Sequence, residues 1–495
     1  MEQKPDTRAS DMEAMLPKWQ KVRTILDGLA SMRRQAKTYL PQLPKETDAR
    51  YKFRIEVSKL TNVFADIVEN LAHRAFAKEV TIKEDTTDST FDEFIEDVDG
   101  RGNSLHVVAS ESFYDAIAFG VDWILVDYTK NVPQNATVAQ ERKMGARPYW
   151  VRYPVESVRA AYTAMIEGKE QFVHVRLLEH KTVRKGFFET TEKRVLEFNR
   201  EKEGEAWGGA TITVWKEVKG DDGQLKWIIE EPKRPLTIQV IPLVAVLTGR
   251  RKGKGWTFKP PMQDAADLQI TLFQQETGLE FAKTMSCYPM IAGNGVSPSI
   301  GEDGKPEPIE TGPGIALYAP NTGEGGSASW EILEPSAASL KFLADDVKNT
   351  TKELRELGRQ PLTAQSSGNL TKITTSFAAS KGNSAIQAWA INASDAYNTA
   401  MAYTAMWLKS ELRPLVQIDT DFDTSDSEDD GFSHVMSLRK SGDISRDATL
   451  HEAKRRSILD KKYDPEADAD LILDDLEDGD DETEDEDDDD GIVDP

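Results

Sequence analysis

Three aspartates at alternate positions, Asp419, Asp421 and Asp423, have the spacing with which an EF-hand loop begins. Such a loop binds Ca²⁺ through oxygen ligands, needs glycine at its sixth position for a sharp turn, and closes with a bidentate glutamate at its twelfth. Thr424 and Asp430 occupy those two positions here. The run therefore predicts an acidic surface loop, and we expect no metal site in it.

The sequence carries none of the short motifs that hold a nucleotide or activate a nucleophile. It has no G-x-x-x-x-G-K-[ST], no G-x-S-x-G and no H-E-x-x-H. Residues 249–255, GRRKGKG, have the composition of a phosphate loop but lack the Ser or Thr that would hold Mg²⁺. A solvated basic loop and a contact to DNA or a partner both remain open for them. The six histidines are scattered, and the single cysteine, Cys287, is best interpreted as a small buried side chain. We expect no catalytic residue and no cofactor.

Length and composition indicate a large soluble protein. At 495 residues the chain is long enough for several compact units. It has no apolar run of ~18 residues, so we expect no transmembrane helix, and its charged N-terminus does not resemble a signal peptide. One cysteine excludes an intrachain disulfide and suits a reducing cytoplasm.

The net charge of −25 is concentrated at the end of the chain. From Asp464 to Pro495 there are nineteen Asp or Glu residues and no Lys or Arg. Such a segment cannot bury apolar surface and repels itself, so we predict disorder over residues 464–495. Three roles remain open for it: simple solubilisation, repulsion of DNA or binding of a scaffold, and mimicry of nucleic acid as in a histone chaperone.

The first half of the chain predicts helices followed by an antiparallel sheet. Apolar residues recur at three- and four-residue spacing over residues 11–36 and again over 50–77, which predicts two helices. Residues 91–119 predict one or two further helices. Residues 120–128 predict a strand, and several runs within 147–248 alternate apolar and polar residues, as strands with one solvated face do.

The following 150 or so residues have a distinctive order of elements. A Pro-Pro pair opens a predicted helix over residues 260–286, and a glycine-rich insert with short apolar runs follows. Helical periodicity returns over residues 336–358. A polar segment, 359–373, then precedes a long helix rich in small residues that begins at residue 374.

This order resembles the stem, clip, stem, tunnel loop and wing helix of tailed-bacteriophage portal proteins. Other segments resemble one portal family, in the same order along the chain. They are residues 37–76 (KTYLPQLPKETDARYKFRIEVSKLTNVFADIVENLAHRAF), 120–128 (GVDWILVDY), 147–162 (RPYWVRYPVESVRAAY), 416–422 (VQIDTDF) and 438–459 (LRKSGDISRDATLHEAKRRSIL). The collinear order of these motifs, over most of residues 15–463, carries the resemblance.

The resemblance implies an α+β portal fold with a mixed helix and antiparallel-sheet wing, an α-helical stem, a small β-containing clip, a long wing helix and a helical crown. The implied boundaries are wing 1–259, first stem helix 260–286, clip 287–335, second stem helix 336–358, tunnel loop 359–373, long wing helix 374–413, crown 414–463 and disordered acidic tail 464–495. The clip assignment rests on position alone.

The resemblance also implies a virion protein, made in the host cytoplasm, that is not an enzyme. It would form a homo-oligomeric ring, a dodecamer, at the portal vertex of the capsid and conduct double-stranded DNA during packaging and ejection. Its partners would be the terminase large subunit, a head–tail adaptor and the major capsid protein or scaffold, with no membrane partner. Two other classes stay open: an acidic-tailed chaperone or scaffold, and a Mg-dependent nucleic-acid enzyme.

Two sets of candidate residues follow from the resemblance. We expect DNA-channel contacts from the tunnel loop, because short hydrogen bonds to phosphate oxygens are independent of base sequence: Arg359, Gln360, Gln365, Ser366, Asn369 and Lys372. We expect close subunit packing at Ala385 and Ala388, with Trp389 as a larger anchor. A plain linker and an ordinary core helix remain the alternatives for these two segments. Residues 341–356 mix Lys and Arg with Asp and Glu, which suits a channel wall that does not grip DNA.

Overall fold

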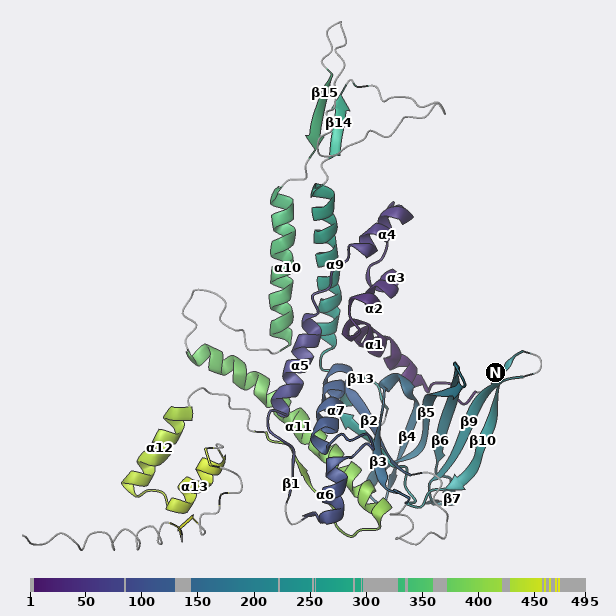
Figure 1. The fold of residues 1–495 in the computed structure, drawn as a ribbon, viewed down its shortest axis with the longest axis vertical. Helices are drawn as coiled ribbons and strands as arrows, with labels where there is room; N and C mark the ends of the chain where they lie inside the picture. The colour runs from purple at the N-terminus through teal and green to yellow at the C-terminus, as the bar shows by residue number, and fades with distance from the viewer. Residues whose placement is uncertain are drawn as a thin grey trace, which may run out of the picture. The chain divides into compact units, whose positions relative to one another are not determined.

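The computed structural model describes residues 4–83, 86–129, 144–220, 223–251, 253, 255–287, 290–294, 296, 328–333, 337–358, 372–420, 428–455, 458–459, 463, 468–469 and 471. The chain divides into two compact units, Met1–Phe422 and Asp423–Pro495. The first unit combines helices with antiparallel sheets, so the fold is α+β, as the sequence predicted (Figure 1).

Short helices fill the first part of the chain, where we predicted two longer ones. They are α1 (Ser10–Leu26), α2 (Leu29–Arg34), α3 (Ala36–Tyr39), α4 (Asp48–Glu56) and α5 (Val63–Ala75). The predictions of one continuous helix over residues 11–36 and another over 50–77 were both wrong, because each range is divided into shorter helices. The first helix ends before Gly28, whose φ of 81° lies in the left-handed region. The second is interrupted because the side chain of Asn62 accepts a hydrogen bond from the Ala65 N–H at 3.1 Å and caps α5.

The alternating runs form a five-stranded antiparallel sheet in the order β10-β9-β6-β5-β4, which confirms the predicted sheet. On β9, for example, Ile212 and Val214 are buried whereas the threonines on either side of Ile212 are half-buried. The strands are β4 (Val158–Ile166), β5 (Lys169–Lys185), β6 (Phe188–Asn199), β9 (Thr211–Lys219) and β10 (Leu225–Pro235), with the short ladder β7 (Lys202–Glu203) and β8 (Ala206–Trp207) between β6 and β9.

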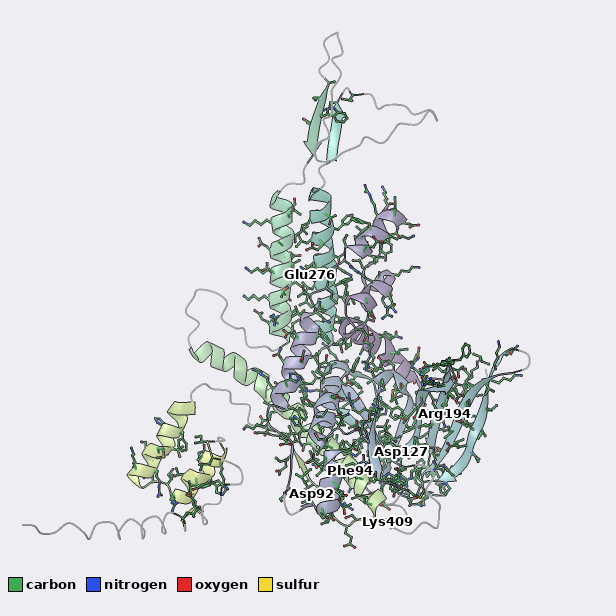
Figure 2. All side chains as sticks on the ribbon, in the orientation of Figure 1. Asp92, Phe94, Asp127, Arg194, Glu276 and Lys409 are labelled. Atoms are coloured by element: carbon green, nitrogen blue, oxygen red, sulfur yellow. The ribbon has the colours of Figure 1, made fainter. Side chains whose placement is uncertain are left out.

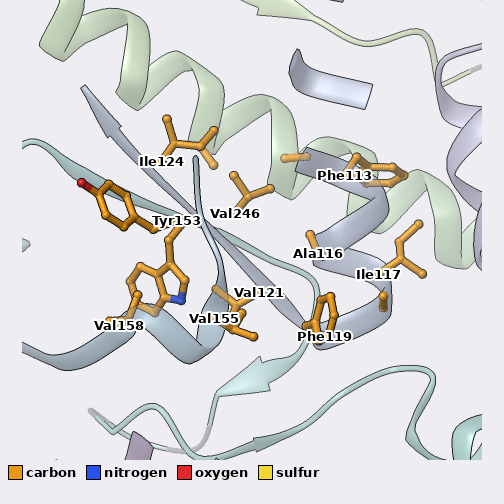
Figure 3. Close-up of a cluster of buried hydrophobic side chains, with 14 of the residues drawn as sticks. Phe113, Ala116, Ile117, Phe119, Val121, Ile124, Tyr153, Val155, Val158 and Val246 are labelled. Carbon is orange, nitrogen blue, oxygen red and sulfur yellow. The ribbon is translucent and has the colours of Figure 1, made fainter. Parts of the chain in front are cut away.

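A second antiparallel sheet, in the order β11-β2-β3, lies within the main core. Its strands are β2 (Val121–Tyr128), β3 (Pro148–Tyr153) and β11 (Leu243–Leu247), and α6 (Ser89–Glu96) and α7 (Leu105–Phe119) precede it in the chain. Figure 3 shows Phe113 and Phe119 of α7 gathered with Val121 and Ile124 of β2. The first six residues of β2 are all buried, which explains its continuous apolar sequence.

Helix α11 (Lys372–Leu408) packs on β11 and β2 and belongs to the same core. Two hydrogen bonds join α11 to the sheet: Trp150 Nε1 donates to Thr404 Oγ1 at 3.0 Å, and Trp407 Nε1 donates to the Val126 carbonyl at 3.0 Å. A third joins it to α7, where the Tyr397 hydroxyl donates to the Ala109 carbonyl at 2.8 Å. These contacts fix the position of the helix along the sheet as well as its distance from it.

The long helix ends at Leu408 and not at residue 413, as we had predicted. Lys409 has a φ of 55°, and the Ser410 N–H donates to the Ala405 carbonyl, so the last turn is closed off by a left-handed residue.

Before α11, two long helices are joined through a two-stranded module. Helix α9 (Gln263–Cys287) packs along α10 (Ala337–Leu357), and the two run in opposite directions (Figure 1). Strand β14 (Met290–Asn294) pairs antiparallel with β15 (Ser329–Leu333). Most of the predicted clip, including residues 297–327, lies outside the described residues.

The second unit contains α12 (Glu428–Ser441) and α13 (Arg446–Arg455), which pack on each other. The unit boundary lies after Phe422 and not at residue 414, because β16 (Val416–Gln417) pairs with β1 (Thr81–Ile82) of the first unit. Of the predicted disordered tail, residues 464–495, only 468, 469 and 471 are described, so the prediction of disorder concerns residues outside the described ranges.

Candidate functional site

The α9–α10 pair is attached to the rest of the first unit by buried polar contacts. Glu276 of α9, labelled in Figure 2, is only 5% exposed and accepts a hydrogen bond from the Thr61 N–H at 2.7 Å. Gln269, about two turns earlier on the same face of the helix, accepts from the Phe64 N–H at 2.9 Å and donates to the Thr61 carbonyl at 3.0 Å. Because a buried polar group without a partner is costly, these contacts fix α9 against the segment that joins α4 to α5.

The C-terminal end of α10 is fixed against α5. Leu354 is fully buried, and Arg355 Nη1 lies 2.9 Å from Asp66 Oδ2. Gly358 follows the helix and is buried so closely that a Cβ at this position would lie 2.5 Å from Ile67 Cγ2. The point at which the chain leaves α10 is therefore held rigidly, whatever follows it.

The exposed face of α10 carries both signs of charge. Lys341, Lys348 and Lys352 share one face by their spacing, and all three are exposed. Asp345 is exposed within the same row, and Glu356 lies 3.9 Å from Lys352. The helix therefore presents no strong cationic surface to which a phosphate backbone would bind tightly.

The candidate DNA contacts fall almost entirely outside the described residues. Arg359, Gln360, Gln365, Ser366 and Asn369 belong to residues 359–371, which the structure does not describe. Lys372 is the first residue of α11, and its backbone alone is described. What the structure gives is the fixed start of the segment at Gly358, so these contacts stay a prediction.

The three candidate packing residues on α11 have different surroundings. Trp389 is buried in the core of its own chain, and Ala385 is half-buried against that core. Ala388 is exposed, as is Ile391, whose side chain is 50% exposed. Of the three candidates, Ala388 is therefore the one whose side chain is free to meet a neighbouring molecule.

Arg250 and Arg251 of the basic segment GRRKGKG contact other parts of their own chain. Arg250–Arg251 form β12, which pairs with β13 (Phe258–Lys259). The Arg251 guanidinium lies 4.2 Å from the ring centroid of Trp256 and 2.9 Å from Glu170 Oε1. The Arg251 cation is thus paired within its own chain, which favours a structural role over phosphate binding for this residue.

A cluster of charged side chains that sequence reasoning missed lies between α7, β2 and β3. Arg152 Nε is 3.0 Å from Asp122 Oδ2, its Nη1 is 2.8 Å from Glu111 Oε2, and its Nη2 contacts Asp115. Burial raises the pKa of Asp122 to about 6, although the nearby guanidinium acts in the opposite direction. A single aspartate within the apolar run VDWILV was the available signal, since a carboxylate there must find a buried partner.

This cluster is organised around an arginine and has the character of a structural ion network. Within the described ranges, no three His, Cys, Asp or Glu side chains are grouped so that they could hold a metal ion. None of the helices that the structure describes is both long and apolar enough to cross a bilayer.

Comparison with known proteins gives a match to a family and matches to solved structures. Residues 261–408 match the family described as "Domain of unknown function (DUF4055)". The matched range begins just before α9 and ends with the last residue of α11. No curated protein matches the chain. Among solved structures, a chain from the "Neck of native GTA particle computed with C12 symmetry" matches at 11% identity and a TM-score of 0.39, covering 78% of this chain and 88% of that chain.

Proposed function

We propose that this protein is a phage portal protein, which forms a ring at one capsid vertex and conducts DNA during packaging and ejection. The observation that carries the proposal is the order of elements from α9 to α11. Two neighbouring helices of opposite direction are joined through the β14–β15 pair, and a segment of polar composition then leads into a long helix buried in the main core. This is the order of stem, clip, stem, tunnel loop and wing helix that the sequence resemblance implies.

A ring requires two different surfaces on each subunit that fit each other head to tail. The chain offers exposed apolar side chains on the elements where such contacts are expected. Phe342 on α10 is 70% exposed, and Ile391 and Met406 on α11 are 50% and 40% exposed. Such exposed apolar side chains are available for contact with another protein surface.

Passage of DNA requires a wall that touches the phosphates without holding them. Each cation that pairs with a phosphate releases counterions and tightens binding. The mixed charge on the exposed face of α10 supports weak contact of this kind. In this proposal the ATP-driven step belongs to the terminase large subunit, and the portal has no catalytic site. The head–tail adaptor and the capsid protein or scaffold would bind other faces of the ring.

Negative-stain electron microscopy of the purified full-length protein tests the proposal. We expect closed rings of roughly twelve subunits with a central hole, since head-to-tail interfaces that close generate cyclic symmetry. Monomers or small oligomers at micromolar concentration would contradict it. They would favour instead the acidic-tailed chaperone or the Mg-dependent enzyme, and a nuclease assay with Mg²⁺ would separate those two.

A further inference from the structure

The second unit places a cation-rich stretch directly before the acidic tail. Residues 439–463 contain eight Lys or Arg and four Asp or Glu, in a chain whose net charge is −25. The nineteen carboxylates of residues 464–495 follow at once. Opposite charges on adjacent segments of one chain attract at high effective concentration, because the linker between them is short.

The first part of the tail that the structure describes already contacts this stretch. Asp468 Oδ2 lies 3.9 Å from Arg446 Nη2 and accepts a hydrogen bond from the Tyr463 hydroxyl. That hydrogen bond raises the pKa of Tyr463. The Lys454 ammonium lies 6.0 Å from the Tyr463 ring centroid. An acidic residue of the tail is thus seated among cationic and aromatic side chains of the second unit.

These contacts locate the start of the tail relative to α13. Arg446 is the first residue of α13, and Lys454 lies in its last turn. Tyr463 lies beside Lys454 near the end of the helix, and Asp468 lies beside Arg446 at its beginning. The residues after Asp468 extend up to ~3.3 Å each, which is ample to reach the end of α12.

The end of α12 offers further cations. Arg439 and Lys440 stand in its last turn, and both are exposed, as is Arg446. Exposed cations of this density bind polyanions, and a DNA backbone carries the same kind of charge as the tail. DNA and the tail would therefore compete for one surface.

We propose that the acidic segment 464–495 docks on the cationic surface formed by Arg439, Lys440, Arg446 and Lys454, and thereby keeps DNA from binding there. The surface is a nucleic-acid phosphate site of the second unit, and the tail is its internal competitor. This inference concerns the second unit alone and does not depend on ring formation.

Binding of a fluorescent double-stranded DNA oligonucleotide of mixed sequence, measured by anisotropy, tests the competition. The full chain is compared with a chain ending at Tyr463, at low salt and at about 0.2 M salt, where screening weakens phosphate contacts. We expect the shortened chain to bind at least roughly tenfold more tightly at low salt, with a smaller gain at the higher salt.

Removal of nineteen negative charges could raise DNA affinity at any site, so a matched pair of variants is needed. In the shortened chain, R439Q, K440Q, R446Q and K454Q together should return binding to the level of the full chain. Four other exposed lysines that lie outside the α10 face, changed as K37Q, K52Q, K169Q and K181Q, should leave the gain in place. Equal effects of the two sets, or no gain on truncation, would overturn the proposal.

Docking itself is measured without any substitution. A zero-length carbodiimide joins a lysine to a carboxylate only where the two touch, and mass spectrometry identifies the joined peptides. In the full chain we expect tail carboxylates to be joined to Lys440 and Lys454, with the yield falling as salt is raised. Tail peptides joined only to lysines of residues 1–422, or to none, would show that the tail does not dock on this surface.

Discussion

The carboxylate of Glu276 in α9 accepts hydrogen bonds from both the backbone N–H and the side-chain hydroxyl of Thr61, the residue just before the cap of α5. Two donors of one residue thus depend on a single buried acceptor group. The contact joins residues that are 215 positions apart in sequence and ties the α9–α10 pair to the N-terminal helices.

Replacing Glu276 with alanine should destabilise the protein. Glu276→Ala removes a buried carboxylate that accepts two hydrogen bonds from Thr61, and loss of hydrogen bonds to a charged group costs about 1–3 kcal/mol. Glu276→Gln keeps one acceptor oxygen and should cost less. Urea unfolding of the full chain measures both. Glu280→Ala, one turn further along α9, removes only partly exposed pairs with Lys59 and Lys283 and should cost no more than ~1 kcal/mol. Equal losses at both positions would contradict a special role for the Thr61 contact.

The close approach of Gly358 to Ile67 gives a second prediction. Gly358→Ala forces its new methyl group against Ile67, and overpacking of this kind costs about 1–3 kcal/mol. In the background of Ile67→Ala the same change should cost much less, because the space is then open. Gly278→Ala is the matched control, since nothing lies within 4 Å of its added Cβ, and helix propensity should make it neutral or stabilising by up to ~1 kcal/mol. Additive losses in the double variant would show that the two residues do not meet.

Asp122 predicts a dependence of stability on pH. Its folded-state pKa is raised by burial to about 6, above the ordinary 3.8, so the folded protein holds this proton more tightly than the unfolded chain. The resulting stabilisation is complete below pH 3.8 and is lost as pH rises through 6. The loss is on the order of 3 kcal/mol, from about 1.4 kcal/mol per pKa unit. Asp122→Asn removes this titration, so its stability relative to wild type should rise between pH 4 and pH 7, as measured by urea unfolding.

Asp99 serves as a control of opposite sign. Partial burial acts to raise its pKa, but hydrogen bonds from the Asn103 side chain and from the backbone N–H groups of Arg101 and Asn103 outweigh burial and lower it. The stability it contributes is present at neutral pH and is lost as pH falls through its folded pKa. Asp99→Asn should therefore lose stability relative to wild type mainly at neutral pH. The same trend for both variants would contradict the assignment for Asp122.

Apolar periodicity in the sequence predicted the helices and strands well where each element buries one face. Helical periodicity identified α9 and α10, and alternation identified the five-stranded sheet, because both have one buried face. The same periodicity runs through Gly28 and Asn62, where the backbone of Gly28 ends one helix and the side chain of Asn62 begins another as its N-cap. A stripe of apolar residues cannot show such a break when the stripe continues on the next helix.

Long-range polar contacts were beyond the reach of the sequence. Asp122 and Arg152 come from neighbouring strands, 30 positions apart, and nothing local marks them as partners. On α11 the small residues predicted close packing but could not tell which molecule they pack against. Tyr397 and Trp407 bond within their own chain, so much of this helix belongs to the subunit core. Only its exposed side, which includes Ala388, remains for a neighbour.

A comparison of Ala388→Trp with Ala385→Trp separates assembly from folding. Ala385 packs on the core of its own chain, so a bulky side chain there should lower the stability of the subunit itself by about 1–3 kcal/mol. Ala388 is exposed, and tryptophan there should leave subunit stability within about 0.5 kcal/mol. If Ala388 lies at a subunit interface, Ala388→Trp should nevertheless shift material from rings to monomers in gel filtration. Intact rings for Ala388→Trp would place this side of α11 away from the interface.

The last prediction tests whether the segment between α10 and α11 touches DNA. Deleting residues 363–370 and closing the gap with a short glycine linker should leave rings intact, because the segment has little apolar area to bury and its start is fixed independently at Gly358. The defect should appear in the amount of DNA packaged per capsid, because neutral contacts to phosphate oxygens act during passage. Lys372→Glu should lower packaging in the same direction through repulsion, and added salt should reduce that effect. Lys52→Glu, at an exposed position of α4, is the matched charge change outside the segment. Normal DNA content in the deletion and in Lys372→Glu would exclude a DNA contact here, whereas a collapse of ring yield would assign the segment to the subunit interface.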